Sequence, residues 1–349
     1  GGGTPNAISY KFIEKITVKL KERFNFSENY EMAIECNPAH LDFRHIDLLK
    51  KYGFNRISIG IQDFRKDVLD AINRRESKHP LEDIVKKIAD SGFTGTNIDL
   101  VYGLPLQTVD SFKSTIERAI NLGTDRIVTF SYAHVPSVLP RQKVLEDIGF
   151  PSPESKAKMY ENSYDQLTQS GYVSIGMDHY SKPDDEFAIA LSEKKLHRNF
   201  QGYCTRETTG QVYGFGASAI SQLNSAYSQN FKNTMEYIRS IENKNLSVYR
   251  GYALSYNEKV IRYVINSVMC NYYVDFREVA NYFNCPLYEI ISILEYDASN
   301  FKDFIEDGLM GIDGEKITIH KSGRLFTRNI SMRFDPLVKQ KVGTYSKTI

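Results

Sequence analysis

The residues best suited to chemistry lie within 126–221, above all in the segment His-Arg-Asn-Phe-Gln-Gly-Tyr at 197–203. A run that mixes glycine, aromatic and polar residues without a helix or strand period is typical of a pocket wall. The guanidinium of Arg198 can bind a carboxylate through two parallel hydrogen bonds, and His197 adds a second cation beside it. The two residues indicate either a site for an anionic substrate or a surface pair that neutralises the acidic residues at 184–186.

Polar or small residues close four strand-like segments in the first half of the chain. They are Glu35, Gln62, Asp99 and Ala133. If the strands are parallel, their carboxyl ends meet at one edge and these residues become candidates for a shared site. A solvated strand end explains Glu35 equally well, and ordinary packing explains Ala133. Asp63 is interpreted as a helix cap that accepts hydrogen bonds from backbone amides.

Three further motifs have both a chemical and a structural interpretation. The run Gly1-Gly2-Gly3-Thr4-Pro5 either lets a backbone approach a ligand closely or forms a glycine turn before a helix. Arg74 either faces the site, or opposes a helix dipole and pairs with Glu76. Asp178 and His179 are a candidate acid–base pair, but an aspartate that orients a buried histidine is the favoured interpretation.

The elements that must position these residues alternate between helix and strand. Helices are predicted at 12–24, 41–52, 68–72, 81–88 and 109–122, and strands at 32–34, 56–61, 96–101 and 126–130. This alternation favours parallel pairing with right-handed crossovers. We predict an α/β fold, a barrel-like β/α array whose carboxyl strand ends form the active-site rim, with an open doubly wound sheet as the alternative.

The alternation of predicted helices and strands ends near residue 227. Helices are predicted at 230–243, 258–270, 275–284 and 287–296, followed by a hairpin over 308–319 that turns at Asp313-Gly314. Helices followed by a hairpin resemble a winged-helix domain. We therefore divide the chain into a β/α domain with the pocket segment at 1–225 and a mostly helical, winged-helix-like domain at 226–349 that covers the barrel mouth.

Composition and charge argue against several classes of partner. The formal net charge of +1 provides no field that would attract nucleic acid, and no cation lies between Pro286 and Ser299, where a DNA-reading helix would need one. The sequence contains no apolar run long enough to predict a membrane span. The scattered cysteines contain no C-x-x-C pair and suit reduced thiols; they are Cys36, Cys204, Cys270 and Cys285. We expect a cytoplasmic monomer that binds neither nucleic acid nor membrane.

Taken in order, the motifs resemble the oxygen-independent coproporphyrinogen III oxidases, a family of radical S-adenosylmethionine enzymes. The resemblance rests on GGGTP, IECNP, IGIQDF with INRR, NIDLVYGLP, YAHVP, GMDHY, HRNFQGY, GFGASAIS and RNISMRFD. It covers essentially the whole chain, and HRNFQGY with QDF is much more specific than the glycine turn. It implies a TIM-like radical SAM barrel that here lacks its first strand and helix.

The resemblance implies a reaction of haem biosynthesis. Two propionates of coproporphyrinogen III become vinyl groups, which gives protoporphyrinogen IX without oxygen. The family uses a [4Fe-4S] cluster and two molecules of S-adenosylmethionine, whose cleavage provides a 5′-deoxyadenosyl radical, and it needs an electron donor and acceptor. A carbon radical requires a dry, closed barrel mouth.

Motif matching assigns site residues individually, although it assigns no catalytic residue. The residues matched to contacts with S-adenosylmethionine are Gly2, Gly3 and Thr4 for its methionine portion, Glu35 and Ile220 for the first molecule, and Gln62, Arg74, Asp99 and Ala133 for the second. Gln201 is matched to the substrate pocket. We add Arg198 and Arg206 as candidate clamps for the propionates, because the substrate carries four carboxylates and the chain is nearly neutral.

The chain departs from the family pattern at the metal site. The family's cluster ligands form a C-x3-C-x2-C motif upstream of GGGTP, and the four cysteines have a different spacing. We therefore expect the chain as given to hold no cluster, to be inactive and to be poorly soluble, with the activity belonging to the complete protein. The nearest alternative is a haem-binding chaperone relative, in which residues 62–64 usually read Gln-Ser-Phe.

Overall fold

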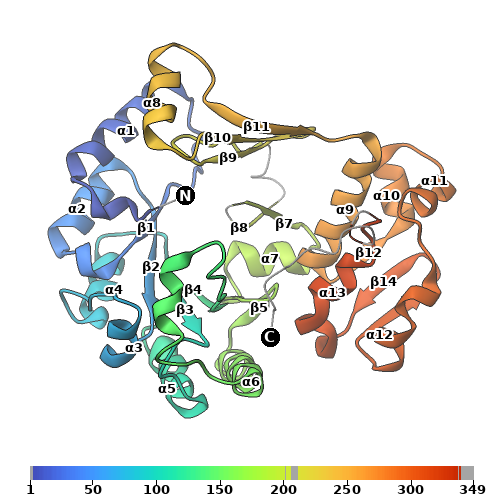
Figure 1. Cartoon of the computed structure of the whole chain (residues 1–349), viewed down its shortest axis with the longest axis horizontal. Helices are drawn as coiled ribbons and strands as arrows, with labels where there is room; N and C mark the ends of the chain where they lie inside the picture. Colours follow the sequence, from blue (N-terminus) through green and yellow to red (C-terminus); the bar gives the residue numbers. More distant parts are fainter. Residues whose placement is uncertain (1–2, 201, 206–210, 337, 339–349) are drawn as a thin grey trace. The chain divides into compact units, whose positions relative to one another are not determined.

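The structure is a computed structural model and describes residues 3–200, 202–205, 211–336 and 338 (Figure 1). The described residues form two compact units. One, the barrel unit, contains residues 3–174 and 178–183; the other, the C-terminal unit, contains 175–177 and the described residues from 184 onward. The predicted boundary between residues 225 and 226 does not coincide with this division and stays a prediction.

Helices and strands alternate along the barrel unit, as the hydrophobic periods predicted. Its strands are β1 (Ala33–Cys36), β2 (Arg56–Gln62), β3 (Gly95–Tyr102), β4 (Arg126–Ser131), β5 (Val173–Ile175) and β6 (His179–Ser181). Its α-helices are α1 (Tyr10–Arg23), α2 (Phe43–Tyr52), α3 (Lys66–Ala71), α4 (Leu81–Asp90), α5 (Val109–Asn121) and α6 (Pro153–Gln169). Short 3-10 turns lie at Pro5–Ala7, Pro38–His40 and Pro140–Leu145. Every helix and strand predicted between residues 12 and 130 is confirmed, with its ends shifted by a few residues.

Local signals explain where the helices begin and end. Asp42 precedes α2 and its carboxylate accepts from the backbone N–H of His45 at 2.9 Å. Gly53 ends the same helix with φ at +101°, a conformation that glycine adopts without strain. Thr108 and Ser111 form a capping box at the start of α5.

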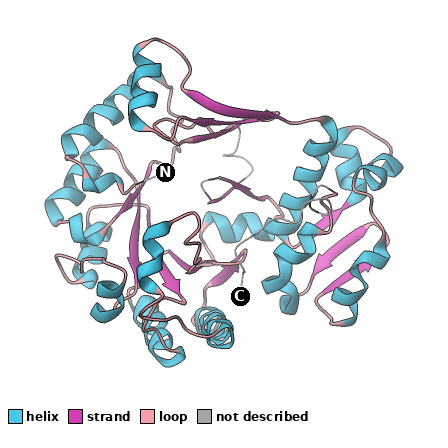
Figure 2. Ribbon diagram, in the orientation of Figure 1, coloured by secondary structure: helices cyan, strands magenta, loops and turns pink. Residues whose placement is uncertain are grey.

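One sheet runs through the barrel unit in the order β1-β2-β3-β4-β6-β5 (Figure 2). Strands β1 to β4 are parallel neighbours. Strand β6, which the sequence analysis did not predict, pairs antiparallel with β4. The connection between β5 and β6 spans only residues 176–178 and is too short for the crossover that parallel strands need.

The two faces of this sheet differ in polarity. On one face Ile57, Ile59, Ile61, Ile98 and Leu100 are at most 3% exposed, and helices α4 and α6 contact β3. The alternate residues of β2 and β3 are half-buried and polar or small; they include Ser58, Gly60, Asn97 and Asp99. A doubly wound sheet would bury apolar side chains on both faces. The polar inner face therefore supports the predicted partial β/α barrel over the doubly wound alternative.

The C-terminal unit begins with short strands that the sequence patterns did not reveal. Its first elements are α7 (Glu186–Ser192), β7 (Leu196–Asn199), β8 (Gly202–Thr205), β9 (Ile220–Gln222), β10 (Ala226–Asn230), α8 (Thr234–Glu242) and β11 (Val248–Ala253). Strands β7 and β8 form a hairpin, and β9 to β11 form an antiparallel sheet in the order β11-β10-β9. The helix predicted at 230–243 begins at Thr234, because Asn230 ends β10 and Asn233 caps the helix.

The rest of the C-terminal unit is the predicted winged-helix-like domain. Its elements are α9 (Tyr256–Asn271), β12 (Tyr273–Asp275), α10 (Phe276–Phe283), α11 (Leu287–Ile293), α12 (Lys302–Glu306), β13 (Met310–Asp313), β14 (Lys316–Ile319) and α13 (Thr327–Met332), with 3-10 turns at Ala298–Phe301 and Lys321–Phe326. The predicted hairpin is present, but its turn residues are Gly314 and Glu315, one position later than predicted, because Asp313 still pairs with Lys316. The unpredicted strand β12 joins it in the order β12-β14-β13. A shared core, which includes Val264, Val268 and Ile317, binds these elements together. Among the described residues, no helix has the length and hydrophobicity that a membrane crossing would require.

Candidate functional site

Polar side chains of the barrel unit converge on Gly60, near the carboxyl end of β2. Gly60 is the register partner of Asp99 on β3. A Cβ atom on Gly60 would lie 2.7 Å from Gln62 Nε2 and 3.1 Å from Arg74 Nη2, so both side chains lie against the glycine. The guanidinium of Arg74 also donates to the Gly60 carbonyl. The structure thus brings together Gln62, Arg74 and Asp99, three of the residues predicted from the sequence.

The backbone at Gln62 has an unusual conformation. Its φ is +70°, in the left-handed region that non-glycine residues rarely adopt, and the β2–β3 register shifts between Gly60 and Gln62. A bulge of this kind re-aims a side chain at a strand end, and strain of this kind is concentrated at functional sites. The distortion directs the Gln62 amide back over Gly60.

Asp99 is the electrostatic centre of the group. Ser58 Oγ donates to Asp99 Oδ2 at 3.1 Å across the β2–β3 pair. Burial raises the pKa of Asp99 to about 6, and the charge of Glu35 adds to this effect, while Ser58, His179 and Arg74 oppose it. Burial also lowers the pKa of Arg74. A nearby cationic ligand would favour the ionised carboxylate of Asp99.

His179 belongs to the same neighbourhood, since its charge acts on Asp99, and no sequence pattern predicted this proximity. Its Nδ1 lies 2.6 Å from Asp178 Oδ1, and the two side chains are 18% and 22% exposed. Its ring meets Phe130 edge-on, with centroids 6.0 Å apart. These contacts agree with the interpretation of Asp178 as the residue that orients His179. Ser58 is the other residue that sequence reasoning missed, because its contact with Asp99 depends on strand register.

Glu35, Ala133, Gly3 and Thr4 lie at exposed or half-exposed positions of the barrel unit. Glu35 is exposed on β1 as the register partner of Ser58. The carbonyl of Ala133, also exposed, accepts from Gln142 Nε2 at 3.0 Å.

Gly3 and Thr4 precede Asn6, which ties the first segment of the chain to the end of β1. Asn6 Nδ2 donates to the Asn37 carbonyl at 3.0 Å, and the Asn37 N–H donates to Asn6 Oδ1 at 2.9 Å. Gly2 lies outside the described residues.

The structure bears on two of the structural alternatives. The prediction that Asp63 caps a helix was wrong, because Arg65 is the N-cap residue of α3 and no side chain caps that helix. Asp63 is instead a buried acceptor, 1% exposed, that accepts from the Arg65 N–H at 2.8 Å and from Gln107 Nε2 at 2.6 Å. Glu76, the suggested partner of Arg74, instead pairs with Lys66 at 3.5 Å. The guanidinium of Arg74 lies against Gly60, which agrees with the interpretation in which it faces the site, and its role there stays a prediction.

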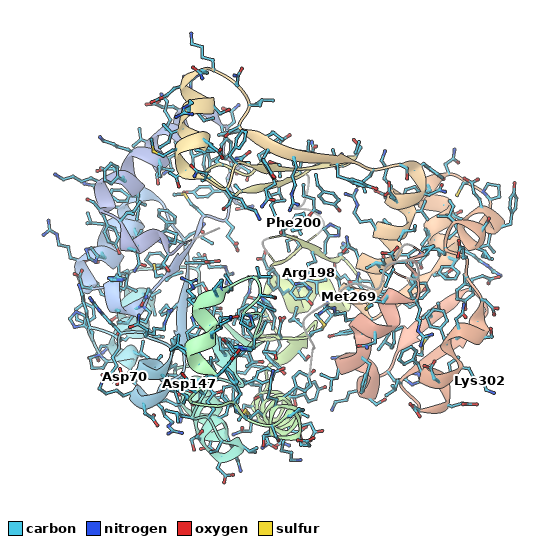
Figure 3. All side chains as sticks on the ribbon, viewed as in Figure 1. Asp70, Asp147, Arg198, Phe200, Met269 and Lys302 are labelled. Atoms are coloured by element: carbon cyan, nitrogen blue, oxygen red, sulfur yellow. The ribbon has the colours of Figure 1, made fainter. Side chains whose placement is uncertain are left out.

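The remaining candidates belong to the C-terminal unit. Arg198, labelled in Figure 3, is half-buried on β7, with its guanidinium carbon 5.4 Å from the centre of the Tyr203 ring. Ile220 begins β9 and is half-buried; an added Cβ on Gly214 would lie 2.7 Å from its carbonyl oxygen. Gln201 and Arg206 lie outside the described residues.

The cysteines do not form a metal site. Cys36 is buried in β1 and Cys270 in α9, while Cys204 in β8 and Cys285 after α10 are half-buried. Within the described ranges, no three His, Cys, Asp or Glu side chains gather in a way that could hold a metal ion. These thiols therefore do not fit a [4Fe-4S] cluster.

Comparison with known proteins agrees with this architecture. The family model of the radical SAM superfamily matches residues 1–119. The oxygen-independent coproporphyrinogen III oxidase of Escherichia coli K12 is 38% identical over 344 residues, which cover 98% of this chain and 74% of that protein. The Synechocystis protein of the same name is 36% identical, with 98% of this chain and 73% of that protein covered.

A solved structure of the Escherichia coli coproporphyrinogen III oxidase (HemN), described as a radical SAM enzyme, has a TM-score of 0.91 and 37% sequence identity to this chain. The match covers 97% of this chain and 77% of that chain. It therefore extends through both the β/α barrel and the winged-helix-like domain. An alignment that spans 98% of the chain at 38% identity shows that the chain belongs to the oxygen-independent coproporphyrinogen III oxidase family.

Proposed function

We propose that this protein converts two propionates of coproporphyrinogen III to vinyl groups without oxygen, giving protoporphyrinogen IX. The protein is a radical SAM oxidoreductase of haem biosynthesis. Its family membership over 98% of the chain supports this activity. The structural observation that carries the proposal is the group of Gln62, Arg74 and Asp99 around Gly60, at the carboxyl ends of parallel strands. That edge is where β/α barrels place their chemistry.

The polar groups at this edge suit S-adenosylmethionine. The cofactor carries a sulfonium, an α-ammonium, a carboxylate and two ribose hydroxyls. The carboxylates of Glu35 and Asp99 would bind its cations or hydroxyls, and the guanidinium of Arg74 would bind its carboxylate. Gln62 offers both a donor and an acceptor. When bound and reductively cleaved, the cofactor supplies a 5′-deoxyadenosyl radical.

The full set of cofactor contacts in the proposal covers two molecules of S-adenosylmethionine. The residues assigned to them are Gly2, Gly3, Thr4, Glu35, Gln62, Arg74, Asp99, Ala133 and Ile220. The substrate would meet Gln201, with Arg198 and Arg206 as partners for its propionates. The cluster is assigned to no residue of this chain. A cytoplasmic location and separate electron donor and acceptor complete the proposal.

The proposal can be tested on the purified chain, without turnover. Calorimetric titration with S-adenosylmethionine should show binding that Gln62→Ala and Asp99→Asn each weaken about tenfold, a loss of roughly 1.4 kcal/mol. Asp70→Asn is the matched control, because Asp70 is exposed on α3 and contacts Lys66. Equal affinity of all four proteins would reject the assigned site.

A second experiment separates the oxidase from the haem-binding alternative. The complete protein is incubated anaerobically with coproporphyrinogen III, S-adenosylmethionine and a chemical reductant, and the porphyrins are separated after oxidation. The oxidase produces protoporphyrin. A protein that binds haem in a titration but leaves coproporphyrinogen unchanged would instead be the chaperone relative.

A further inference from the structure

We propose that the winged-helix-like domain fixes the shape of the β7–β8 hairpin through three consecutive residues, Asn271, Tyr272 and Tyr273, and thereby sets the affinity for the porphyrinogen. We call these residues the positioning triplet. The inference rests on the proposed function, because it takes Arg198 on β7 as a partner of the substrate. The triplet itself would touch no substrate, so its members are positioning residues.

Asn271 binds the first residue of the hairpin. Its Oδ1 accepts from the Leu196 N–H at 3.1 Å, and its Nδ2 donates to the Leu196 carbonyl at 3.1 Å. Asn271 is 8% exposed and Leu196 is 1% exposed, so water does not compete for these bonds. A side-chain amide that satisfies both backbone groups of one residue imitates a neighbouring strand and fixes where β7 begins.

Tyr272 binds a second point, the turn at Gly176. It is the single residue between α9 and β12 and has a left-handed backbone, with φ at +55°. Its carbonyl accepts from the Ile319 N–H at 2.8 Å, which ties it to the core of the winged-helix-like domain. Its hydroxyl donates to the Gly176 carbonyl in a buried contact.

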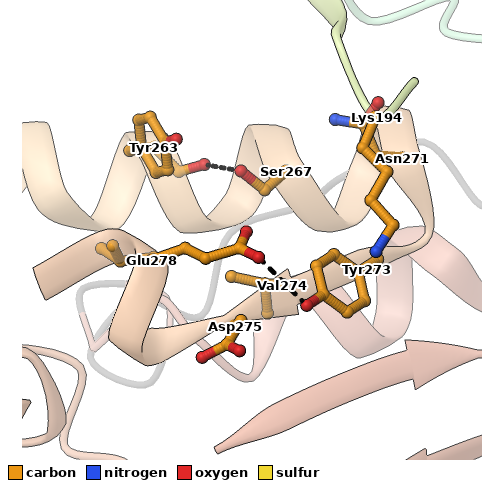
Figure 4. Close-up of a pocket in the computed structure, with 9 residues that line it drawn as sticks. Lys194, Tyr263, Ser267, Asn271, Tyr273, Val274, Asp275 and Glu278 are labelled. Atoms are coloured by element: carbon orange, nitrogen blue, oxygen red, sulfur yellow. Dashed lines mark hydrogen bonds between the residues drawn. The ribbon is translucent and has the colours of Figure 1, made fainter. Parts of the chain in front are cut away.

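Tyr273 binds a third point, the turn before β7. Lys194 Nζ lies 3.3 Å from the centre of the Tyr273 ring, as Figure 4 shows. Lys194 also has a left-handed backbone, with φ at +57°. The Tyr273 hydroxyl lies 3.4 Å from Glu278 on α10, longer than a usual O–H···O hydrogen bond, so the ring itself carries the contact with Lys194. A cation above a tyrosine ring is attracted to its negative face.

The contact of Tyr272 leads to Arg198 through Tyr203, while the contacts of Asn271 and Tyr273 hold the start of the same strand and the turn before it. Arg198 and Tyr203 are register partners in the hairpin, and the guanidinium lies over the Tyr203 ring. The phenol of Tyr203 lies against Gly176, where an added Cβ would overlap it. Gly176 is in turn held by Tyr272. A shift of the triplet would therefore be transmitted to Tyr203 and from Tyr203 to Arg198.

The test uses the full chain and two readouts. Hydrogen exchange reports the opening of residues 196–199 and 202–205, and quenching of coproporphyrin III fluorescence reports its binding. Tyr272→Phe removes one hydroxyl and keeps the ring, while Asn271→Leu removes both bonds to Leu196 at similar volume. Each should raise the exchange rate of the hairpin and the dissociation constant for coproporphyrin III by about three- to tenfold, the expected effect of losing one or two net hydrogen bonds. Binding of S-adenosylmethionine should not change.

Three further variants distinguish positioning from general loss of packing. Ser267→Ala removes a hydrogen bond of 2.9 Å to the Tyr263 carbonyl on the same helix and should leave both readouts unchanged. Tyr273→Phe keeps the ring under Lys194 and should behave like the wild type, whereas Tyr273→Leu should behave like Tyr272→Phe.

Wild-type affinity for coproporphyrin III in both Tyr272→Phe and Asn271→Leu would overturn the inference, even if exchange became faster. Unchanged exchange in both variants would also overturn it. If the wild type itself binds no coproporphyrin III, the proposed function fails, and this inference fails with it; binding by the wild type with equal binding by the variants rejects this inference alone.

Discussion

The hydroxyl of Ser58 donates to the carboxylate of Asp99 at 3.1 Å, and this bond joins the inner faces of two parallel strands. The bond favours the ionised carboxylate, but burial outweighs it and raises the pKa of Asp99 to about 6. The site therefore contains an acid whose charge is destabilised when no cation is bound. A sulfonium or ammonium beside Asp99 would remove that destabilisation.

The first prediction concerns the dependence of stability on pH. Asp99 keeps its proton to a higher pH in the folded chain than in the unfolded chain, so the folded state binds more protons between about pH 4 and pH 6. The stability of the wild type should therefore fall as the pH rises through this window. Asp99→Asn cannot ionise and should be more stable at pH 8, by up to about 3 kcal/mol.

Urea unfolding of both proteins at pH 4.5, 6 and 8 measures this difference. The advantage of Asp99→Asn should shrink as the pH falls, because the wild-type carboxyl becomes neutral too. Asp70→Asn, on the exposed side of α3, should not show this trend. An advantage that stays constant from pH 4.5 to pH 8 would contradict the role of the buried charge.

The second prediction is that replacing Gln62 by glycine preserves or raises stability and weakens cofactor binding. A left-handed φ of +70° costs a non-glycine residue about 1 kcal/mol or more, and glycine avoids this cost. Gln62→Gly should therefore unfold at an equal or higher urea concentration than the wild type, yet bind S-adenosylmethionine more weakly. Gln62→Val should lose about 1–2 kcal/mol of stability, because a β-branched residue is strained in this conformation. A Gln62→Gly protein that is less stable than Gln62→Val would disprove the argument from strain.

The third prediction is that Asp63 contributes to stability and not to the binding of S-adenosylmethionine. Asp63 is buried and accepts from the Arg65 N–H and from Gln107, whereas the family resemblance implies serine at this position for the haem-binding alternative. Asp63→Ser keeps an acceptor for the Arg65 N–H but loses the bond with Gln107. We expect a loss of about 1–3 kcal/mol in the free energy of unfolding, with S-adenosylmethionine affinity unchanged. A large loss of affinity in a stably folded Asp63→Ser would mean that Asp63 acts in the site.

The sequence analysis succeeded for features whose physical signal is local in the sequence. Strand β2 alternates between buried isoleucines and half-buried residues, and Gly53 stands where α2 needs a left-handed end, so both elements could be predicted. Gln62 could be predicted as a site candidate because it ends a strand, whereas Asp99, which lies inside β3, and Arg74 were assigned to the site through the family resemblance. Their convergence on Gly60 depends on register, which a single sequence does not specify.

The features that were missed share a different cause. Strands β7 to β12 are at most six residues long, and β11 is exposed along its length, so no alternation of buried and exposed residues marks it. His179 approaches Asp99 only because β6 returns antiparallel beside β4. Contacts between distant segments, such as Asn271 with Leu196, leave no periodic pattern in the sequence.

The last prediction tests the convergence itself at Gly60. The Cβ of Gly60→Ala would lie 2.7 Å from Gln62 Nε2 and 3.1 Å from Arg74 Nη2, which are the far ends of flexible side chains, whereas the nearest backbone atom, the Cys36 oxygen, is 3.9 Å away. The backbone therefore tolerates the methyl group while both side chains must move. Gly60→Ala should remain within about 1 kcal/mol of the wild-type stability and bind S-adenosylmethionine several-fold more weakly. Gly123→Ala, in open space with φ at +67°, is the reverse control: it should lose stability through backbone strain and keep its affinity. If Gly60→Ala keeps full affinity, the positions of Gln62 and Arg74 over the glycine do not matter for binding, and the proposed site would have to be placed elsewhere on the barrel rim.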